Sequence, residues 1–142
     1  MNTITNGPIQ ALLRARWLYY VGAVLLTFIF WGSGLAKLTD FATAQKEMAM
    51  FGLNPTALYA IATIIVQLGG SALIISGCRF AWLGAGALSV FTILTIFIAH
   101  RFWEMTGEQA FHEKLLVFEH ITVVGGLIVI SILAELRRTS KA

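Results

Sequence analysis

The chain has 142 residues, of which 58% are hydrophobic and only 12% are charged, and its mean hydropathy is +0.80. A soluble domain carries about twice that share of charged residues, so the composition excludes an ordinary soluble protein. The net charge of +3 is small, and the basic residues form no stripe with aromatic residues, which argues against nucleic acid as a partner. The single cysteine, Cys78, excludes an internal disulfide and a paired-cysteine zinc or redox site.

Four apolar runs, each long enough to cross a hydrocarbon core as a helix, are separated by short polar clusters. The first run is too long for the apolar part of a signal peptide, so we expect it to be retained as a span. A short amphipathic helix at the membrane surface is predicted between the first two runs, capped by Asp40 and ended by Gly52. The sequence thus predicts one transmembrane domain over residues 1–142, with spans at about 12–36, 56–77, 80–99 and 115–136.

The connections between these runs predict how the spans are arranged. Only Gly77, Cys78 and Arg79 join the second and third spans, so we expect these two spans to be antiparallel neighbours. No proline falls inside a span, and no broken helix is expected. Spaced glycines within the spans favour tight helix contacts. The predicted fold class is all-α, a polytopic membrane four-helix bundle with short interfacial helices in the outer loops.

The basic residues predict the orientation. With four spans, the termini and the turn at Arg79 share one side of the membrane. Six basic residues fall on that side against four on the other, which favours N- and C-termini in the cytoplasm. The six are Arg14, Arg16, Arg79, Arg137, Arg138 and Lys141.

One polar side chain, Gln67, falls near the middle of the second span, where a polar group is costly unless it is satisfied. A structural interpretation is a hydrogen bond between helices that stabilises the bundle. The functional alternative is a contact with a ligand.

A second polar set consists of Lys37, His100, Glu119 and His120, which topology places in one outer layer. Lys37 and Glu119 could form an ion pair. The two histidines could bridge to Glu119 or accept a proton near neutral pH. The structural interpretation is an ion pair with two interfacial histidines. The functional alternative is a pocket for a quinone headgroup or another small polar ligand. Haem ligation by the two histidines and metal binding through nearby carboxylates are the weakest alternatives, and we expect no metal site.

Three segments carry a resemblance to a known family. They are Phe30-Trp-Gly-Ser-Gly-Leu-Ala-Lys37-Leu, Gly69-Gly-Ser-Ala-Leu-Ile-Ile-Ser-Gly77-Cys-Arg79 and Ala99-His100-Arg-Phe-Trp103-Glu-Met-Thr106-Gly107. The chain resembles the DoxX family of small four-helix membrane proteins, which implies a multi-pass protein of the bacterial inner membrane. Family members often have a glutamate where this chain has Gln67, and Lys-Asn where it has His120-Ile121. An amide cannot titrate, so a proton-carrying role at position 67 is in doubt here.

The resemblance implies a function related to redox chemistry. Some DoxX-like proteins are subunits of thiosulfate:quinone oxidoreductases, and others resemble membrane anchors of complexes that handle oxidative stress. The leading hypothesis is a non-enzymatic subunit or anchor of a redox or oxidative-stress-related complex, with the lipid bilayer and other proteins as partners. The alternative is a quinone-interacting subunit of a membrane oxidoreductase, with a site built from Lys37, His100, Glu119, His120 and Gln67. In that case the chain is part of an enzyme with quinone as its ligand, and it holds no cofactor of its own. A small transporter is the least favoured, since no broken helix or midplane charge supports it.

Overall fold

The computed structural model describes residues 7–140, and this part of the chain contains helices and no strand. The elements are α1 (Pro8–Arg14), α2 (Arg16–Leu26), α3 (Phe28–Thr39), α4 (Phe41–Met50), α5 (Thr56–Ser76), α6 (Ala81–Ala99), the 3-10 helix η1 (Phe102–Glu104) and α7 (Gly107–Thr139). The predicted all-α class is confirmed. The expected contribution of Lys141 to orientation lies outside the described residues.

Three helices are long and apolar enough to cross a membrane: α5, α6 with η1, and α7. The pair α2 and α3 passes the same test only when its two helices are taken together. The chain is therefore an all-α polytopic membrane protein, and the count of four spans stays a prediction that requires α2 and α3 to form one bent span. The second and third predicted spans agree closely with α5 and α6, whereas α7 begins at Gly107 instead of near residue 115.

The first predicted span, 12–36, was wrong as a single helix, and so was the expectation of no broken helix. Helix α1 ends before Ala15, which has extended backbone, and a second break at Thr27 bends α3 by 55° from α2. The Thr27 hydroxyl donates to the carbonyl of Ala23 at 2.7 Å. A threonine that bonds back to the carbonyl four residues earlier often bends a helix, so the bend needs no proline.

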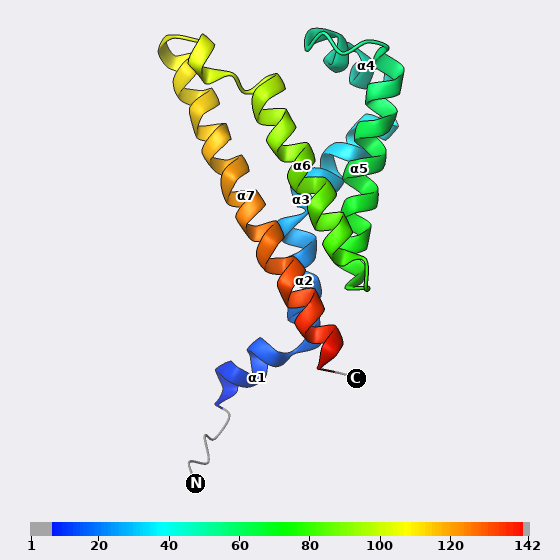
Figure 1. Cartoon of the computed structure of the whole chain (residues 1–142), viewed down its shortest axis with the longest axis vertical. Coiled ribbons are helices and arrows are strands. Elements are labelled where there is room, and N and C mark those ends of the chain that lie inside the picture. Colours follow the sequence, from blue (N-terminus) through cyan, green and yellow to red (C-terminus); the bar gives the residue numbers. More distant parts are fainter. Residues whose placement is uncertain (1–6, 141–142) are drawn as a thin grey trace.

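The bend decides which helices pack together. Helix α2 packs against α5 and α7, whereas α3 leaves this direction and packs against α5 and α4. Helix α6 packs against both α5 and α7 and so lies between them. In Figure 1 the ends of α5 and α7 at the top of the view lie apart, while their other ends converge with α2.

The main hydrophobic core lies where α2, α5, α6 and α7 converge. Ala23, Ile74, Leu88 and Leu127 are fully buried there. A smaller cluster joins α4 to α5 through Ala44, Met48 and Ala60. Burial of apolar side chains between helices thus stabilises both the end where α2, α5, α6 and α7 converge and the end that carries α4.

Helix α4 forms as the sequence predicted. The Asp40 side chain accepts a hydrogen bond from the backbone N–H of Thr43 at 3.1 Å, and Gly52 follows the helix with φ +70°. A carboxylate at the N-cap satisfies a backbone donor that has no partner inside the helix. One face of α4 is buried against α5, so this helix covers the end of α3 and the start of α5.

The turn between α5 and α6 is also as predicted. Gly77 ends α5 with φ +61°, a conformation that L side chains rarely adopt, and α6 then runs back along α5. The expectation that these two helices are antiparallel neighbours is confirmed.

Candidate functional site

The outer polar residues come from two places in the fold. Helix α6 ends at Ala99, with His100 as its C-cap, and the short η1 segment returns the chain to the start of α7. Glu113, Val117 and His120 follow at spacings of four and three, so they share one face of α7. Val117 is buried, which shows that this face is turned toward the rest of the protein.

His100, Glu113 and His120 meet on this face, and we call them the histidine cluster. The Nδ1 atom of His100 lies 2.7 Å from Oε2 of Glu113. The rings of His100 and His120 are edge to face, with their centroids 4.7 Å apart. The side chains of His100 and Glu113 are only 18% and 22% exposed, so this contact is partly withdrawn from solvent.

The hydrogen bonds decide which ring nitrogens are available. A carbonyl oxygen only accepts, so the 2.6 Å contact of His120 Nδ1 with the Leu116 carbonyl places a proton on Nδ1. A neutral His120 ring then presents Nε2 as an acceptor. Glu113 likewise orients the His100 ring through Nδ1. Among the described residues, no hydrogen bond occupies the Nε2 atom of either ring.

The second polar set runs from the middle of α5 to α4, and we call it the polar chain. The Oγ atom of Ser33 accepts two hydrogen bonds. One comes from Nε2 of Gln67 at 3.4 Å, and the other comes from Nζ of Lys37 at 3.1 Å. The same Nζ atom lies 2.9 Å from Oε2 of Glu47. The Lys37 side chain is 12% exposed, so its charge is compensated by Glu47 at a largely buried position.

Gln67 retains one unsatisfied atom. Its side chain is 5% exposed, and its Oε1 atom is buried without a hydrogen-bond partner among the described residues. An unpaired buried acceptor costs about 1–3 kcal/mol, so this atom lowers the stability of the bundle.

The expected outer layer of four residues is therefore two separate sets. The structure brings His100 and His120 together as the topology suggested. It pairs Lys37 with Glu47 instead of Glu119, so that expected ion pair was wrong. Glu119 is exposed, since it precedes His120 by one position and thus points about 100° away around the helix.

Three residues of these sets were missed from the sequence: Glu113, Glu47 and Ser33, whose only signal was its spacing of four from Lys37. The signal for Glu113 was its spacing of seven from His120, which puts both on one helical face. The signal for Glu47 was weaker, because it depends on α4 folding back over α3. Within residues 7–140, no three or more His, Cys, Asp and Glu side chains are grouped so as to hold a metal ion.

Comparison with known proteins gives a family match and one similar protein. A profile of the DoxX family matches residues 20–101, more than half of the chain, which include Lys37, Gln67 and His100. The inner membrane protein YphA of Escherichia coli (strain K12) is 27% identical over 133 residues, covering 93% of this chain and 92% of that protein. No solved structure gives a match.

Proposed function

Because this chain belongs to the DoxX family, we propose that it is an inner-membrane subunit of a redox or oxidative-stress-related complex. The family resemblance supports the redox assignment, and the similarity to an inner membrane protein over nearly the whole chain supports the location. Both forms of the hypothesis, an anchor and a quinone-interacting subunit, require a partner protein, because the sequence offers no flavin, haem or iron–sulfur site.

The histidine cluster favours the quinone-interacting form. It places two imidazole rings in contact at the outer end of apolar helices, each oriented through Nδ1 and each with Nε2 unoccupied by the described residues. A quinone has carbonyl oxygens that accept hydrogen bonds, and its reduced form has hydroxyl groups that donate them. Imidazole can serve either form, because one nitrogen donates and the other accepts.

The carboxylate of Glu113 gives the cluster a means to move a proton. The contact between Glu113 and Nδ1 holds the His100 ring in one orientation. His100 can then give a proton to a bound oxygen at Nε2, or take one from it. Glu113 is partly exposed, so water at the membrane surface can restore the proton.

The surroundings of the cluster suit a lipid-soluble ligand. Phe97 and Trp103, on either side of His100 in the sequence, are 61% and 50% exposed and pack against each other with centroids 6.0 Å apart. Aromatic residues at this level are typical of the membrane interface, where a quinone ring with a long apolar tail would rest.

The break at Thr27 does not favour transport. Broken helices in transporters expose backbone groups to a substrate. Here the carbonyl of Val24, which would bond residue 28 in an unbroken helix, accepts instead from the indole N–H of Trp31 at 3.1 Å. The Thr27 side chain is fully buried and bonded to Ala23. The Val24 carbonyl and the Thr27 hydroxyl are thus bonded within the protein at the break, and a transporter remains the least supported alternative.

Quinone occupancy tests the proposal. The wild-type chain and its His100→Ala and His120→Leu variants are purified in mild detergent, and quinone in the lipid extract is measured per protein. We expect quinone with the wild type and about a tenfold loss in each variant, the effect of one lost hydrogen bond. His112→Ala is the matched control, because His112 is exposed on the same helix and outside the cluster. Unchanged occupancy in both variants would contradict the site. A quinone-free wild type that arrives with other polypeptides would favour the anchor.

A further inference from the structure

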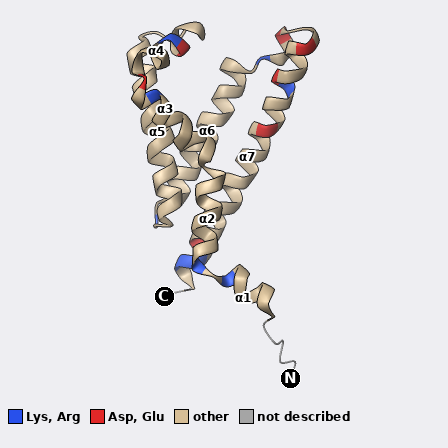
Figure 2. Ribbon diagram, turned by 180° about the vertical axis from the view of Figure 1, so that it is seen from behind, with Lys and Arg blue, Asp and Glu red and all other residues tan. Residues whose placement is uncertain are grey.

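The end of the molecule where α2 begins and α7 ends is basic, whereas the opposite end is acidic. Figure 2 shows this separation on the ribbon: the positions at the lower end are mostly blue for Lys and Arg, whereas most of the red Asp and Glu positions lie in the upper part, with some blue ones among them. Among the described residues, the basic end has five arginines and one acid, Glu135. The arginines are Arg14, Arg16, Arg79, Arg137 and Arg138.

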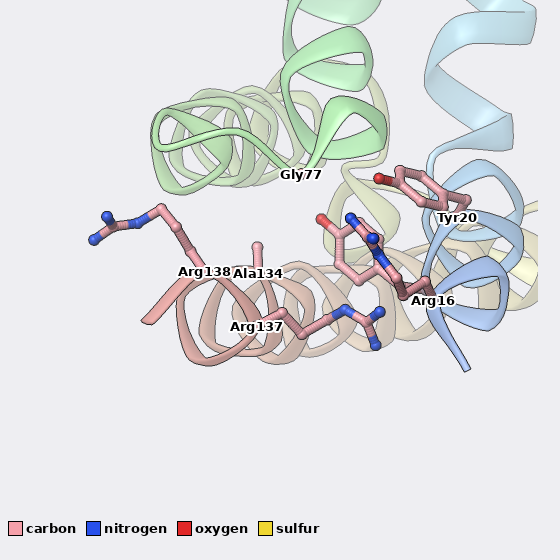
Figure 3. A pocket seen from close by; sticks show the side chains of 7 residues that line it. Arg16, Tyr20, Gly77, Ala134, Arg137 and Arg138 are labelled. Carbon is pink, nitrogen blue, oxygen red and sulfur yellow. The ribbon is translucent and has the colours of Figure 1, made fainter. Parts of the chain in front are cut away.

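Part of this charge lines a pocket, which we call the basic pocket. Its volume is about 340 Å³, and its walls come from α2, the α5–α6 turn and the end of α7. Gly77 and Ala134 leave the space open because they have little or no side chain. Figure 3 shows Arg16 and Tyr20 on α2, and Arg137 extending from α7 toward the start of α2.

The pocket is held in shape by its aromatic wall. The Tyr19 hydroxyl donates to the carbonyl of Ile74 at 2.8 Å, and the ring is 6% exposed. The guanidinium carbon of Arg137 lies 5.5 Å from the centroid of this ring. A guanidinium stacked on a fixed aromatic ring loses less freedom when it binds an anion.

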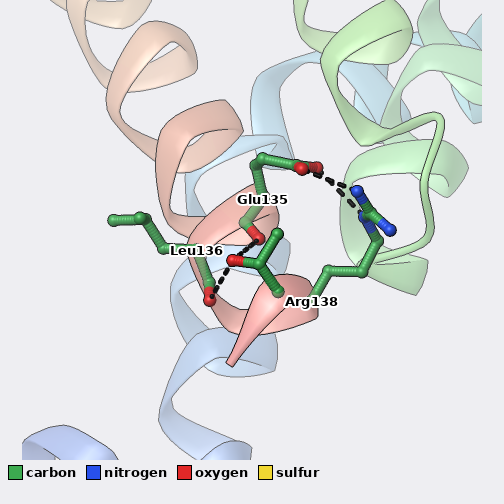
Figure 4. A network of polar contacts seen from close by, with 4 residues as sticks. Glu135, Leu136 and Arg138 are labelled. Carbon is green, nitrogen blue, oxygen red and sulfur yellow. Dashed lines mark hydrogen bonds and ion pairs between the residues drawn. The ribbon is translucent and has the colours of Figure 1, made fainter. Parts of the chain in front are cut away.

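Two of the three arginines in the pocket keep their charge available. Glu135 binds Arg138 through two contacts, Nη2 to Oε1 at 2.6 Å and Nε to Oε2 at 3.1 Å (Figure 4). Within residues 7–140, neither Arg16 nor Arg137 lies within ion-pair distance of a carboxylate. The pocket therefore presents two uncompensated guanidinium groups.

The pocket opens next to apolar surface. Tyr20, Val21 and Leu136 are 43%, 43% and 60% exposed on the helices that form it. In a membrane protein such side chains face lipid, so an anion in the pocket lies where the headgroups meet the acyl chains. A preference of basic residues for one side of the membrane explains the charge, but it does not require a formed pocket with a stacked arginine.

We propose that the basic pocket binds the phosphodiester headgroup of an anionic phospholipid. Guanidinium groups match phosphate oxygens in geometry as well as in charge. The acyl chains of the lipid lie along the exposed apolar faces of α2 and α7. Basic pockets between membrane helices bind such headgroups in the same manner.

Native mass spectrometry of the full chain in detergent, titrated with phosphatidylglycerol, tests this proposal. We expect the Arg16→Gln/Arg137→Gln variant to bind about tenfold more weakly than the wild type. The matched control is Arg101→Gln/Lys114→Gln, which removes the same charge from the opposite end. An equal loss in both double variants would show an effect of net charge alone and would overturn the site.

A second measurement separates a lipid from free phosphate. Phosphatidylglycerol should raise the unfolding temperature of the wild type, whereas phosphatidylcholine and inorganic phosphate at equal ionic strength should not. Stabilisation by inorganic phosphate as strong as by the lipid would overturn the lipid assignment. Should the double variant aggregate, Arg16→Gln alone serves as the test, because the Arg16 side chain makes no hydrogen bond or ion pair within the described part of the chain. Unchanged binding in that variant would contradict the proposal.

Discussion

Gly84 of α6 lies so close to Gly70 of α5 that a methyl group at position 84 would be 2.6 Å from the Gly70 carbonyl oxygen. The same methyl group would be 2.8 Å from Cβ of Leu73. Neither the Gly70 carbonyl oxygen nor Cβ of Leu73 can move aside as the tip of a flexible side chain can, because both are fixed by the backbone of α5. The two helices approach each other through this pair of glycines, as small residues allow in membranes.

We therefore expect Gly84→Ala to destabilise the protein by about 1–3 kcal/mol, the usual cost of overpacking a close contact. The measurement is the free energy of unfolding in mixed detergent micelles. Gly86→Ala is the control on the same helix, because a methyl group there would meet no atom within 4 Å. Alanine is the better helix former, so the control should be neutral or more stable by up to about 1 kcal/mol. Equal destabilisation in both variants would show that the close approach is not what matters.

A second prediction concerns the bend at Thr27. Trp31→Phe removes the indole N–H that bonds the Val24 carbonyl and keeps an aromatic ring. An unsatisfied carbonyl in lipid is costly, so we expect a loss of about 1–2 kcal/mol in unfolding free energy. Trp82→Phe is the control, because Trp82 is 61% exposed and its indole makes no hydrogen bond within the described residues. A loss of similar size at Trp82 would contradict this role of Trp31.

A third prediction concerns Gln67, whose Oε1 atom is buried and has no hydrogen-bond partner within residues 7–140. Gln67→Met keeps the shape of the side chain while removing its polar atoms. The lost contact with Ser33 is long, at 3.4 Å, and the unpaired acceptor disappears with it. We expect unfolding free energy to change by less than about 1 kcal/mol. A decrease of several kcal/mol in the free energy of unfolding would mean that Gln67 forms a hydrogen bond that stabilises the bundle.

A fourth prediction concerns orientation and uses Cys78 in the α5–α6 turn. The basic residues predict that this turn faces the cytoplasm. A membrane-impermeant maleimide should then label Cys78 only after the cells are permeabilised. Hydrogen bonding to Ser76 lowers the pKa of the Cys78 thiol, so the labelling rate should reach its plateau at a lower pH than for an ordinary cysteine.

The matched reporter for the other side is Cys78→Ser combined with Glu108→Cys, since Glu108 is exposed at the start of α7. This variant should be labelled in intact cells whose outer membrane is permeable to the reagent. The reverse pattern for the two cysteines would place the basic end outside.

Local signals in the sequence predicted much of the fold. Asp40 and Gly52 bound α4, and Gly77 ends α5, because a cap and a left-handed glycine depend only on their neighbours in the chain. The break at Thr27 was missed, because hydropathy treats threonine as neutral and the usual indicator of a break is proline. Its hydroxyl bends the helix only through a bond to Ala23 that composition does not reveal.

The sequence predicted the depth of the candidate site along the helices, but it did not predict the direction in which each side chain points around its helix. Topology places Glu119 and His120 at the same depth, but adjacent residues on a helix point about 100° apart. His120 thus meets His100 while Glu119 does not, and Glu113, two turns earlier on the shared face, takes the expected acidic role. Lys37 pairs with Glu47 because α4 folds back over the end of α3, which no pattern in the sequence predicted.

Photolabelling tests most directly whether the histidine cluster is a quinone site. The purified chain is irradiated with an azido-quinone, with and without excess unmodified quinone, and the modified residues are identified by mass spectrometry. The proposed function predicts labels that the excess quinone suppresses, in residues 97–104 of α6 and η1 and in residues 113–120 of α7. Labels spread evenly over the lipid-facing helices, or confined to the basic end, would contradict it.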